Sequence, residues 1–303
     1  MQEGLELEMH NLKGVILAGG EGTRLKPLTK CTSKQLLPVF DKPMIFYPIS
    51  TLMLAGVKDF LIITNEKYNQ NFKDLLGDGS KLGVRFSYKI QENPDGLAAG
   101  LKLSEPFFDD YDTQKPFVFA LGDNILITDD LQKIFTNSFE KIRSSDMLGS
   151  IFSIEVRNPE DFGVVEFNDE KPISLIEKPK DGISNWAIPG FYIYSKEVFN
   201  LIDGLSKSDR GELEITDLNK LLLEMDKLDV RKFGRSTIWY DAGTIENLNE
   251  INQIITNIFK RTGNSIGCLE EIAIKKGFIK KDKLFSEVSL ENSDYFNYVK
   301  NLQ

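Results

Sequence analysis

A glycine-rich turn near the start of the chain carries the residue types that hold phosphate groups. The turn Gly19–Gly22 has glycine at three of its four positions and follows the apolar run Val15–Leu17. Glycines let a backbone approach an anion closely, and the guanidinium of Arg24 adds a planar fork of N–H donors. Lys34 supplies a second cation ten residues after Arg24. Such a pair of cations suits a reaction that builds negative charge on phosphate oxygens.

The turn differs from two related phosphate-binding motifs. A P-loop ends in a Gly-Lys pair followed by Ser or Thr, and no such pair follows here. The dinucleotide motif G-x-G-x-x-G needs a third glycine where this chain has Leu25. A tight turn after a first strand, without a ligand, is the alternative that the turn alone leaves open.

Two aspartates each follow an apolar run, Asp123 in Gly-Asp-Asn and Asp241 in Trp-Tyr-Asp-Ala-Gly-Thr. Mg²⁺ takes oxygen ligands and commonly uses one or two carboxylates together with substrate phosphates. Each aspartate could instead cap the turn or helix that follows it. Because phosphate-binding residues precede them, we expect Asp123 and Asp241 to form a magnesium site.

Strand and helix patterns alternate through the first half of the chain. The predicted strands are 13–18, 59–64, 84–91 and 116–121. The predicted helices are 43–55, 68–76, 96–103 and 130–142. This alternation predicts an α/β fold, a Rossmann-like three-layer sandwich with a mostly parallel central sheet. The carboxyl ends of such strands share one edge, where ligands bind.

Composition excludes several classes of partner. The 303 residues carry a net charge of −9, which argues against a general nucleic-acid binder but not against a nucleotide substrate. No apolar stretch approaches the roughly 18 residues of a membrane span, so no membrane partner is expected. The two cysteines, Cys31 and Cys268, have no metal-binding spacing and fit a cytoplasmic setting. The only histidine, His10, precedes the first strand, which leaves no histidine for Ser-His or Cys-His chemistry in the body of the chain.

The next motifs resemble those of the sugar-1-phosphate nucleotidyltransferases, especially the glucose-1-phosphate thymidylyltransferases. That family opens with L-A-G-G-x-G-T-R-L and continues with S-K-Q-L-L-P and D-K-P-M-I, which stand here at Leu17–Leu25, Ser33–Pro38 and Asp41–Ile45. The resemblance covers nearly the whole chain after Lys13. It implies that dTTP and α-D-glucose 1-phosphate react to give dTDP-glucose and pyrophosphate, with Mg²⁺ as the cofactor.

The motifs and the resemblance together give a set of site residues. The expected catalytic residues are Arg24, Lys34, Asp123, Lys178 and Asp241, of which Asp123 and Asp241 would hold the metal. The expected nucleotide-binding residues are Leu17, Ala18, Gly19, Gly20, Gly22, Thr23, Arg24, Gln35, Gln91, Pro94 and Gly96. The expected sugar-phosphate-binding residues are Asn124, Gly163, Glu177, Lys178 and Ile188.

The implied reaction is an in-line attack of the sugar phosphate on the α-phosphorus of the nucleotide, after which pyrophosphate leaves. The protein then contributes positioning and charge stabilisation rather than a covalent intermediate. Arg24 is expected to hold the triphosphate. Lys34 is expected to neutralise charge near the α-phosphate, and Lys178 to steer the sugar phosphate.

Four segments are expected along the chain. Residues 1–12 are an N-terminal extension, and 13–250 are the nucleotidyltransferase domain. Within that domain, a nucleotide-binding part (about 13–150) precedes an inserted, partly antiparallel sugar-binding lobe (about 151–244). Residues 251–303 form C-terminal helices packed on the same domain. The resemblance also implies a homo-oligomer, a tetramer.

Two alternatives stay open, and the chain departs from the family in places. The same chemistry could use UTP or another sugar 1-phosphate, because one methyl group in a pocket is worth only about 1–3 kcal/mol. A non-catalytic nucleotide-sugar sensor is the second alternative. Residues 125–128 and 274–276 replace the family's F-Y-G-H and F-R-K. These segments help to form the family's regulatory site, so feedback inhibition by the end product is in doubt here.

Overall fold

The first strand, β1 (Leu12–Ala18), is buried along its whole length, as its apolar run predicts. The computed structural model describes residues 12–113, 115–180 and 182–302, so the expected N-terminal extension lies outside the described residues except for Leu12. The chain divides into two compact units. The described part of unit 1 comprises 12–90, 122–126 and 240–302, and unit 2 comprises 91–121 and 127–239.

A parallel sheet forms the centre of unit 1. It contains β1, β4 (Val57–Thr64) and β5 (Arg85–Ile90), and β4 pairs in parallel with both of the others. The register aligns Ala18 with Thr64, and Thr64 with Ile90. The carboxyl ends of the three strands therefore lie at one edge, where the glycine-rich turn leaves β1.

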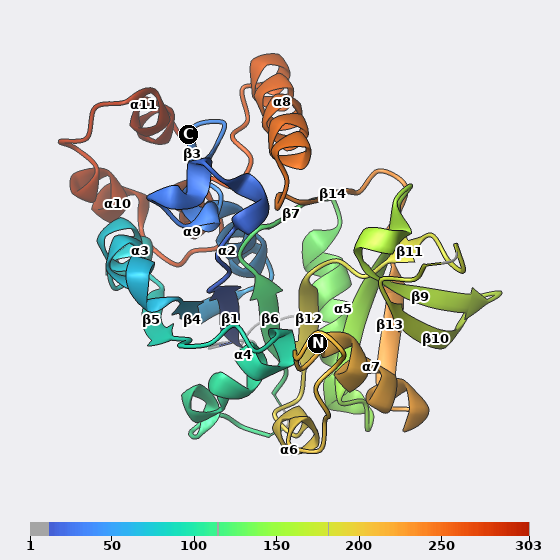
Figure 1. Cartoon of the computed structure of the whole chain (residues 1–303). Coiled ribbons are helices and arrows are strands. Elements are labelled where there is room, and N and C mark those ends of the chain that lie inside the picture. The colour runs from blue at the N-terminus through green and yellow to red at the C-terminus, as the bar shows by residue number, and fades with distance from the viewer. Residues whose placement is uncertain (1–11, 114, 181, 303) are drawn as a thin grey trace. The chain divides into compact units, whose positions relative to one another are not determined.

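Helices cover this sheet. α2 (Phe46–Leu54) packs on β1 and β4, and α3 (Asn69–Leu76) packs on β5. α9 (Leu269–Lys275) packs on α2 (Figure 1). The other helices of unit 1 are η1 (Thr23–Leu25), η2 (Leu28–Lys30), η3 (Lys34–Leu36), η4 (Glu66–Tyr68), η5 (Ser80–Leu82), α8 (Ile245–Thr262), α10 (Lys281–Glu287) and α11 (Asp294–Lys300).

The helix expected from residue 43 begins at Phe46 instead. Lys42 and Pro43 form a short strand, β3, which pairs antiparallel with β2 (Pro38–Val39). A proline suits the first turn of a helix, but it is equally compatible with a short edge strand. Contacts with residues far along the chain decide between the two, since Phe40 and Lys42 of the hairpin bond to Asn252 and Ile266.

Unit 2 contains a mainly antiparallel sheet. β12 (Phe191–Tyr194) runs antiparallel to both β6 (Phe117–Leu121) and β8 (Gly149–Glu155). β11 (Trp186–Ala187) joins β8 to β9 (Gly163–Asn168), and β9 forms a hairpin with β10 (Lys171–Glu177), seen in Figure 1. β13 (Leu228–Lys232) is parallel to β8. The remaining helices of this unit are α4 (Leu97–Leu103), η6 (Glu105–Phe108), α5 (Leu131–Ser144), η7 (Pro159–Asp161), α6 (Val198–Ile202) and α7 (Ile215–Glu224).

The α/β class predicted from the alternation is confirmed, and so is the antiparallel character of the chain after residue 150. Two further strands, β7 (Asn124–Ile127) and β14 (Ile238–Asp241), form a small separate sheet. β7 follows Asp123 directly, and β14 ends at Asp241, so each strand carries or adjoins one of the two candidate metal-binding aspartates. Within the described ranges, no helix combines the length and apolar character that a membrane crossing requires.

Candidate active site

The glycine-rich turn is held by a residue that lies outside the motif. Gly22 has a φ of +62°, a conformation that side chains other than glycine rarely adopt. Its carbonyl accepts a hydrogen bond of 2.7 Å from Thr29 Oγ1, and a Cβ at Gly22 would lie 2.9 Å from Thr29 Cγ2. The close packing of Thr29 therefore requires glycine here and fixes the start of η1, which carries Arg24.

Lys34 lies beside the same turn. A Cβ at Gly20 would lie 3.5 Å from Lys34 Cε and 3.8 Å from its Nζ, and a Cβ at Gly22 would lie 3.0 Å from Lys34 Cβ. The lysine side chain is largely buried. The turn and the ammonium group therefore share one location, as binding of a phosphate group to both would require.

The ammonium group of Lys34 forms an ion pair with Asp123 Oδ2. Burial opposes the charged form of Asp123, but the charge and hydrogen bond of Lys34 outweigh it, so the pKa of Asp123 is lowered. Burial also opposes the charge on Lys34, yet Asp123 and Asp241 raise its pKa on balance. Both groups are therefore charged at neutral pH.

Asp241 lies beside the second cation. Arg24 Nη2 lies 3.7 Å from Asp241 Oδ2, and the arginine side chain is 59% exposed. A Cβ at Gly243 would lie 2.6 Å from Arg24 Nη2 and 2.8 Å from Asp241 Oδ1. Glycine at this position therefore leaves room for the guanidinium. The N–H of Gly243 also donates to Asp241 Oδ1 at 3.0 Å.

The two aspartates are linked through the backbone as well as by charge. The N–H of Ala242 donates to the carbonyl of Asp123 at 3.0 Å. Burial raises the pKa of Asp241 to about 6, and the charge of Asp123 adds to the increase. This effect requires the two carboxylates to lie close enough to repel each other.

The two carboxylates Asp123 and Asp241 suit a Mg²⁺ ion that also binds substrate phosphates. Within the described ranges, no group of three or more His, Cys, Asp or Glu side chains could hold a metal ion. Two adjacent carboxylates without a third protein ligand match a cation that completes its coordination with substrate phosphates and water. Asp123 and Asp241 are the residues that would hold it.

Gln35 lies against the wall of the turn. A Cβ at Gly122 would lie 3.0 Å from Gln35 Cγ and 3.1 Å from the carbonyl of Leu17, to which Gly122 also donates its N–H at 2.9 Å. Ser33 Oγ donates to Gln35 Oε1 at 2.6 Å, and both side chains are buried. The hydrogen bond from Ser33 fixes the orientation of the Gln35 amide, whose nitrogen carries two N–H donors.

In unit 2, Glu177 is held by two side chains at the end of β10. Thr216 Oγ1 donates to Glu177 Oε2 at 2.6 Å, and Arg210 Nη2 lies 3.3 Å from Oε1. A Cβ at Gly163 would lie 3.1 Å from Glu177 Oε2. Ile188 donates its N–H to the carbonyl of Gly163 at 2.8 Å. The structure therefore brings three of the expected sugar-binding residues together.

The other expected residues take simpler positions. Lys178 is exposed, has a φ of +46°, and donates its N–H to the carbonyl of Phe162 at 3.0 Å. Gly96 has a φ of +105°, and a Cβ there would lie 2.4 Å from the carbonyl of Leu213. Asn124, expected near the sugar, donates its amide to Asp123 Oδ1 at 3.2 Å. Gln91 follows β5 directly, and Pro94 is exposed in the loop before Gly96.

Sequence reasoning missed three supporting residues. They are Thr29 beside Gly22, Ser33 beside Gln35, and Asn247, whose amide donates to the carbonyl of Asp241 at 2.8 Å. Ser33 stood within a quoted motif, but nothing in the sequence distinguished its hydroxyl from one exposed to water. Asn247 lies in the first turn of α8, three residues after the capping residue Thr244. That spacing is the one sequence signal that could have pointed to it.

Comparison with known proteins gives the family. The family model described as nucleotidyl transferase matches residues 13–258. A glucose-1-phosphate thymidylyltransferase of Neisseria meningitidis serogroup A is 44% identical over 90% of this chain and 92% of the relative. The enzyme of the same name from Mycolicibacterium smegmatis is 42% identical over 95% of this chain and 98% of its own.

Solved structures agree with these relatives. A Bacillus anthracis protein assigned as a candidate glucose-1-phosphate thymidylyltransferase, crystallised with sucrose, is similar with a TM-score of 0.71, 38% identity and coverage of 80% of this chain and 94% of its own. A UDP-glucose pyrophosphorylase in complex with UDP-glucose shares the fold, with a TM-score of 0.69, 24% identity and coverage of 82% and 99%. The chain thus belongs to the nucleotidyl transferase family, in the group of the glucose-1-phosphate thymidylyltransferases.

Proposed function

We propose that this protein joins dTTP and α-D-glucose 1-phosphate to give dTDP-glucose and pyrophosphate. The observation that carries the proposal is the cluster of Arg24, Lys34, Asp123 and Asp241 around the glycine-rich turn. Two cations and two carboxylates at one turn match the needs of phosphoryl transfer, in which charge on phosphate oxygens must be stabilised. The group of relatives named above supplies the substrates.

In the proposed reaction, unit 1 holds the triphosphate. The exposed guanidinium of Arg24 is free to turn toward the β- and γ-phosphates and to stabilise the leaving pyrophosphate. Lys34 exchanges its ion pair with Asp123 for the α-phosphate, where negative charge must be neutralised as the new bond forms. The amide of Gln35, fixed by Ser33, donates to the nucleotide.

Mg²⁺ bound to Asp123 and Asp241 would supply Lewis-acid stabilisation of phosphate oxygens. Asp123 would be available to the metal once Lys34 pairs with the α-phosphate instead. The N–H of Gly243 would fix the carboxylate of Asp241 for the same role.

Unit 2 supplies the residues for the sugar phosphate. The carboxylate of Glu177, held by Thr216 and Arg210, accepts hydrogen bonds from sugar hydroxyls. Gly163 contributes space beside that carboxylate. Lys178 follows Glu177 directly and steers the phosphate as a point charge.

The experiment that tests the function is pyrophosphate release from dTTP or UTP with glucose 1-phosphate, with Mg²⁺ or with a chelator. Turnover that requires both the sugar phosphate and Mg²⁺ supports the enzyme, and a higher kcat/KM for dTTP than for UTP supports the thymidylyl assignment. Binding of dTDP-glucose without any turnover would instead identify a nucleotide-sugar sensor. A higher kcat/KM for UTP, or for another sugar 1-phosphate, would change the assigned substrate but would not contradict the proposed mechanism.

Two further parts of the proposal concern the setting of the protein. Cys31 and Cys268 are both free thiols, which supports a cytoplasmic location. A homotetramer stays a prediction from the family, and sedimentation at several protein concentrations tests it.

A further inference from the structure

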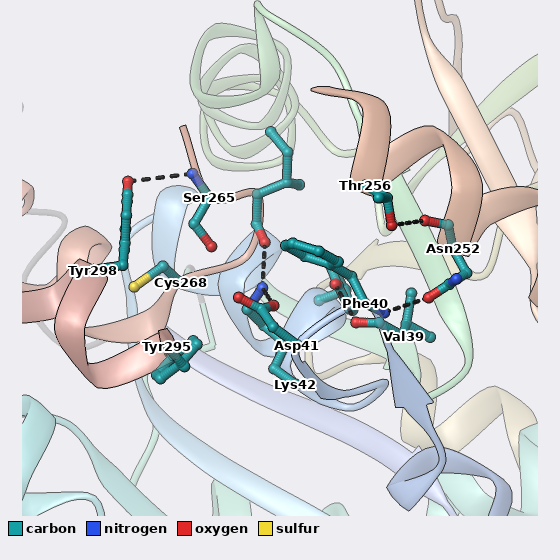
Figure 2. A network of polar contacts seen from close by, with 12 residues as sticks. Val39, Phe40, Asp41, Lys42, Asn252, Thr256, Ser265, Cys268, Tyr295 and Tyr298 are labelled. Carbon is teal, nitrogen blue, oxygen red and sulfur yellow. Dashed lines mark hydrogen bonds and ion pairs between the residues drawn. The ribbon is translucent and has the colours of Figure 1, made fainter. Parts of the chain in front are cut away.

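The Asp41–Met44 motif has no part in the mechanism above, yet it contains a buried lysine. Lys42 is 3% exposed. Its ammonium forms an ion pair with Asp41 and donates to the carbonyl of Ile266 at 3.1 Å (Figure 2). Burial of an ammonium group is costly unless it is paired and hydrogen-bonded. The contacts of Lys42 therefore indicate a specific task for this side chain.

Aromatic rings complete the surroundings of the ammonium. Lys42 Nζ lies 5.8 Å from the ring centroid of Phe40, 5.3 Å from that of Tyr47 and 5.6 Å from that of Tyr295. Tyr47 belongs to α2 and Tyr295 to α11, whereas Ile266 precedes α9. One side chain of the β2–β3 hairpin thus contacts three separate segments of unit 1.

The same hairpin is bonded to the residues that carry the proposed chemistry. It begins one residue after η3, which contains Lys34 and Gln35. The N–H of Ile45 donates to the carbonyl of Gln35, and that of Met44 donates to the carbonyl of Leu37, both at 2.9 Å. A shift of the returning strand would therefore move the backbone of η3.

We propose that Lys42 is a positioning residue for the nucleotide site: its buried ammonium fixes the β2–β3 hairpin, and the hairpin fixes Lys34 and Gln35. The inference rests on the roles proposed above for Lys34 and Gln35. Unlike those two residues, Lys42 acts only through the backbone that follows η3.

Two other contacts hold the hairpin independently of Lys42. Asn252 of α8 accepts a hydrogen bond from the N–H of Phe40 at 2.6 Å, and Tyr47 donates its hydroxyl to the carbonyl of Val39 at 2.8 Å. Because these contacts remain when the ammonium is removed, we expect Lys42→Met to fold with a loosened hairpin. Methionine also keeps an unbranched apolar stem in the same space.

The first test is the kinetics of Lys42→Met. We expect the KM for dTTP to rise and kcat/KM for dTTP to fall by about tenfold to a hundredfold, the scale of a misplacement of about 1 Å. The KM for glucose 1-phosphate should stay unchanged, because Lys34 and Gln35 serve the nucleotide. Amide hydrogen exchange of residues 34–45 should become faster. Lys42→Arg keeps the cation, so its KM for dTTP and its amide exchange should be closer to those of the parent protein than the values of Lys42→Met.

Tyr298→Phe is the matched control. The Tyr298 hydroxyl accepts from the N–H of Ser265 at 3.2 Å (Figure 2). It also donates to Glu271 at 2.7 Å, and neither partner belongs to the hairpin. Its loss should lower Tm and leave the KM for dTTP unchanged. A Lys42→Met protein that behaves in this same way, with unchanged exchange at 34–45, would overturn the inference.

Two more variants cover the remaining outcomes. If Lys42→Met does not fold, Asp41→Asn weakens the same anchor and should raise the KM for dTTP by a smaller factor; an unchanged KM would then refute the positioning role. Lys34→Met and Gln35→Ala test the proposed function separately. If neither variant changes the dTTP kinetics, the roles proposed for Lys34 and Gln35 are wrong. That result would not bear on whether Lys42 holds the hairpin.

Discussion

Lys34 forms an ion pair with Asp123, which lies 89 residues later in the chain. The pair joins a cation expected to bind phosphate to a carboxylate expected to bind metal. Each group compensates the other's burial, so the removal of one leaves an unpaired charge in a partly buried site. In this arrangement the two charges neutralise each other.

The first prediction concerns the loss of this cation. Lys34→Met should lower kcat by about 10²–10³, the scale seen when one preorganised charge-stabilising donor is removed. The assay is pyrophosphate release at saturating substrates. Lys30→Met changes an exposed lysine of η2 and should have no effect. A full rate in Lys34→Met would remove Lys34 from the chemistry.

A second prediction uses the space beside Arg24. Gly243→Ala would place a Cβ 2.6 Å from Arg24 Nη2, so the guanidinium must move. We expect a weaker hold on the triphosphate, measured as a higher Kd for dTTP by calorimetry. Gly234→Ala is the matched control, because nothing described lies within 4 Å of a Cβ there. Equal affinities in the two variants would contradict the position assigned to Arg24.

The third prediction is a titration without metal. Burial and the charge of Asp123 raise the pKa of Asp241 from 3.8 to about 6, so its carboxyl gains a proton as pH falls through about 6. Since the folded-state pKa is above the unfolded value, this group favours the folded state below about pH 4, and the benefit is lost as pH rises through about 6.

Asp123→Asn tests the cause of this shift. The variant removes the repelling charge and releases Lys34 to face Asp241, so the pKa of Asp241 should fall. Carboxyl-carbon NMR in the absence of divalent metal measures it, and Asp130→Asn, at an exposed position, is the control. An unchanged pKa would mean that the two carboxylates do not interact.

A fourth prediction separates the sugar from the nucleotide. Glu177→Gln weakens the hydrogen bonds to Thr216 and Arg210 and to the sugar hydroxyls. We expect the KM for glucose 1-phosphate to rise by about tenfold to a hundredfold, as for the loss of a charged hydrogen-bond partner worth 1.5–3 kcal/mol. The KM for dTTP should not change. Glu170 has an exposed carboxylate that contacts Lys232. Glu170→Gln is the control and should leave the KM for glucose 1-phosphate and the KM for dTTP unchanged.

Local patterns in the sequence predicted the strands well and the helix start at residue 43 less well. β1 and β4 are buried apolar runs, and such runs have few alternatives to a central strand. The helix expected from Pro43 begins at Phe46, because Lys42 is drawn into a hairpin by partners more than 200 residues away. A pattern of neighbouring residues carries no information about such partners.

By itself, the sequence determined the fold class, the family and the types of residue that could hold phosphate and metal. Motifs of this kind are local. Gly22 and Arg24 are two residues apart, so the sequence alone shows that one turn carries both a flexible backbone and a cation for phosphate. Only the tertiary structure decided that Lys34 pairs with Asp123, that Arg24 lies beside Asp241, and that Ser33 holds Gln35. Those relations depend on burial and on distances across folded segments, which raise or lower pKa values and orient donors in ways that spacing along a chain does not encode.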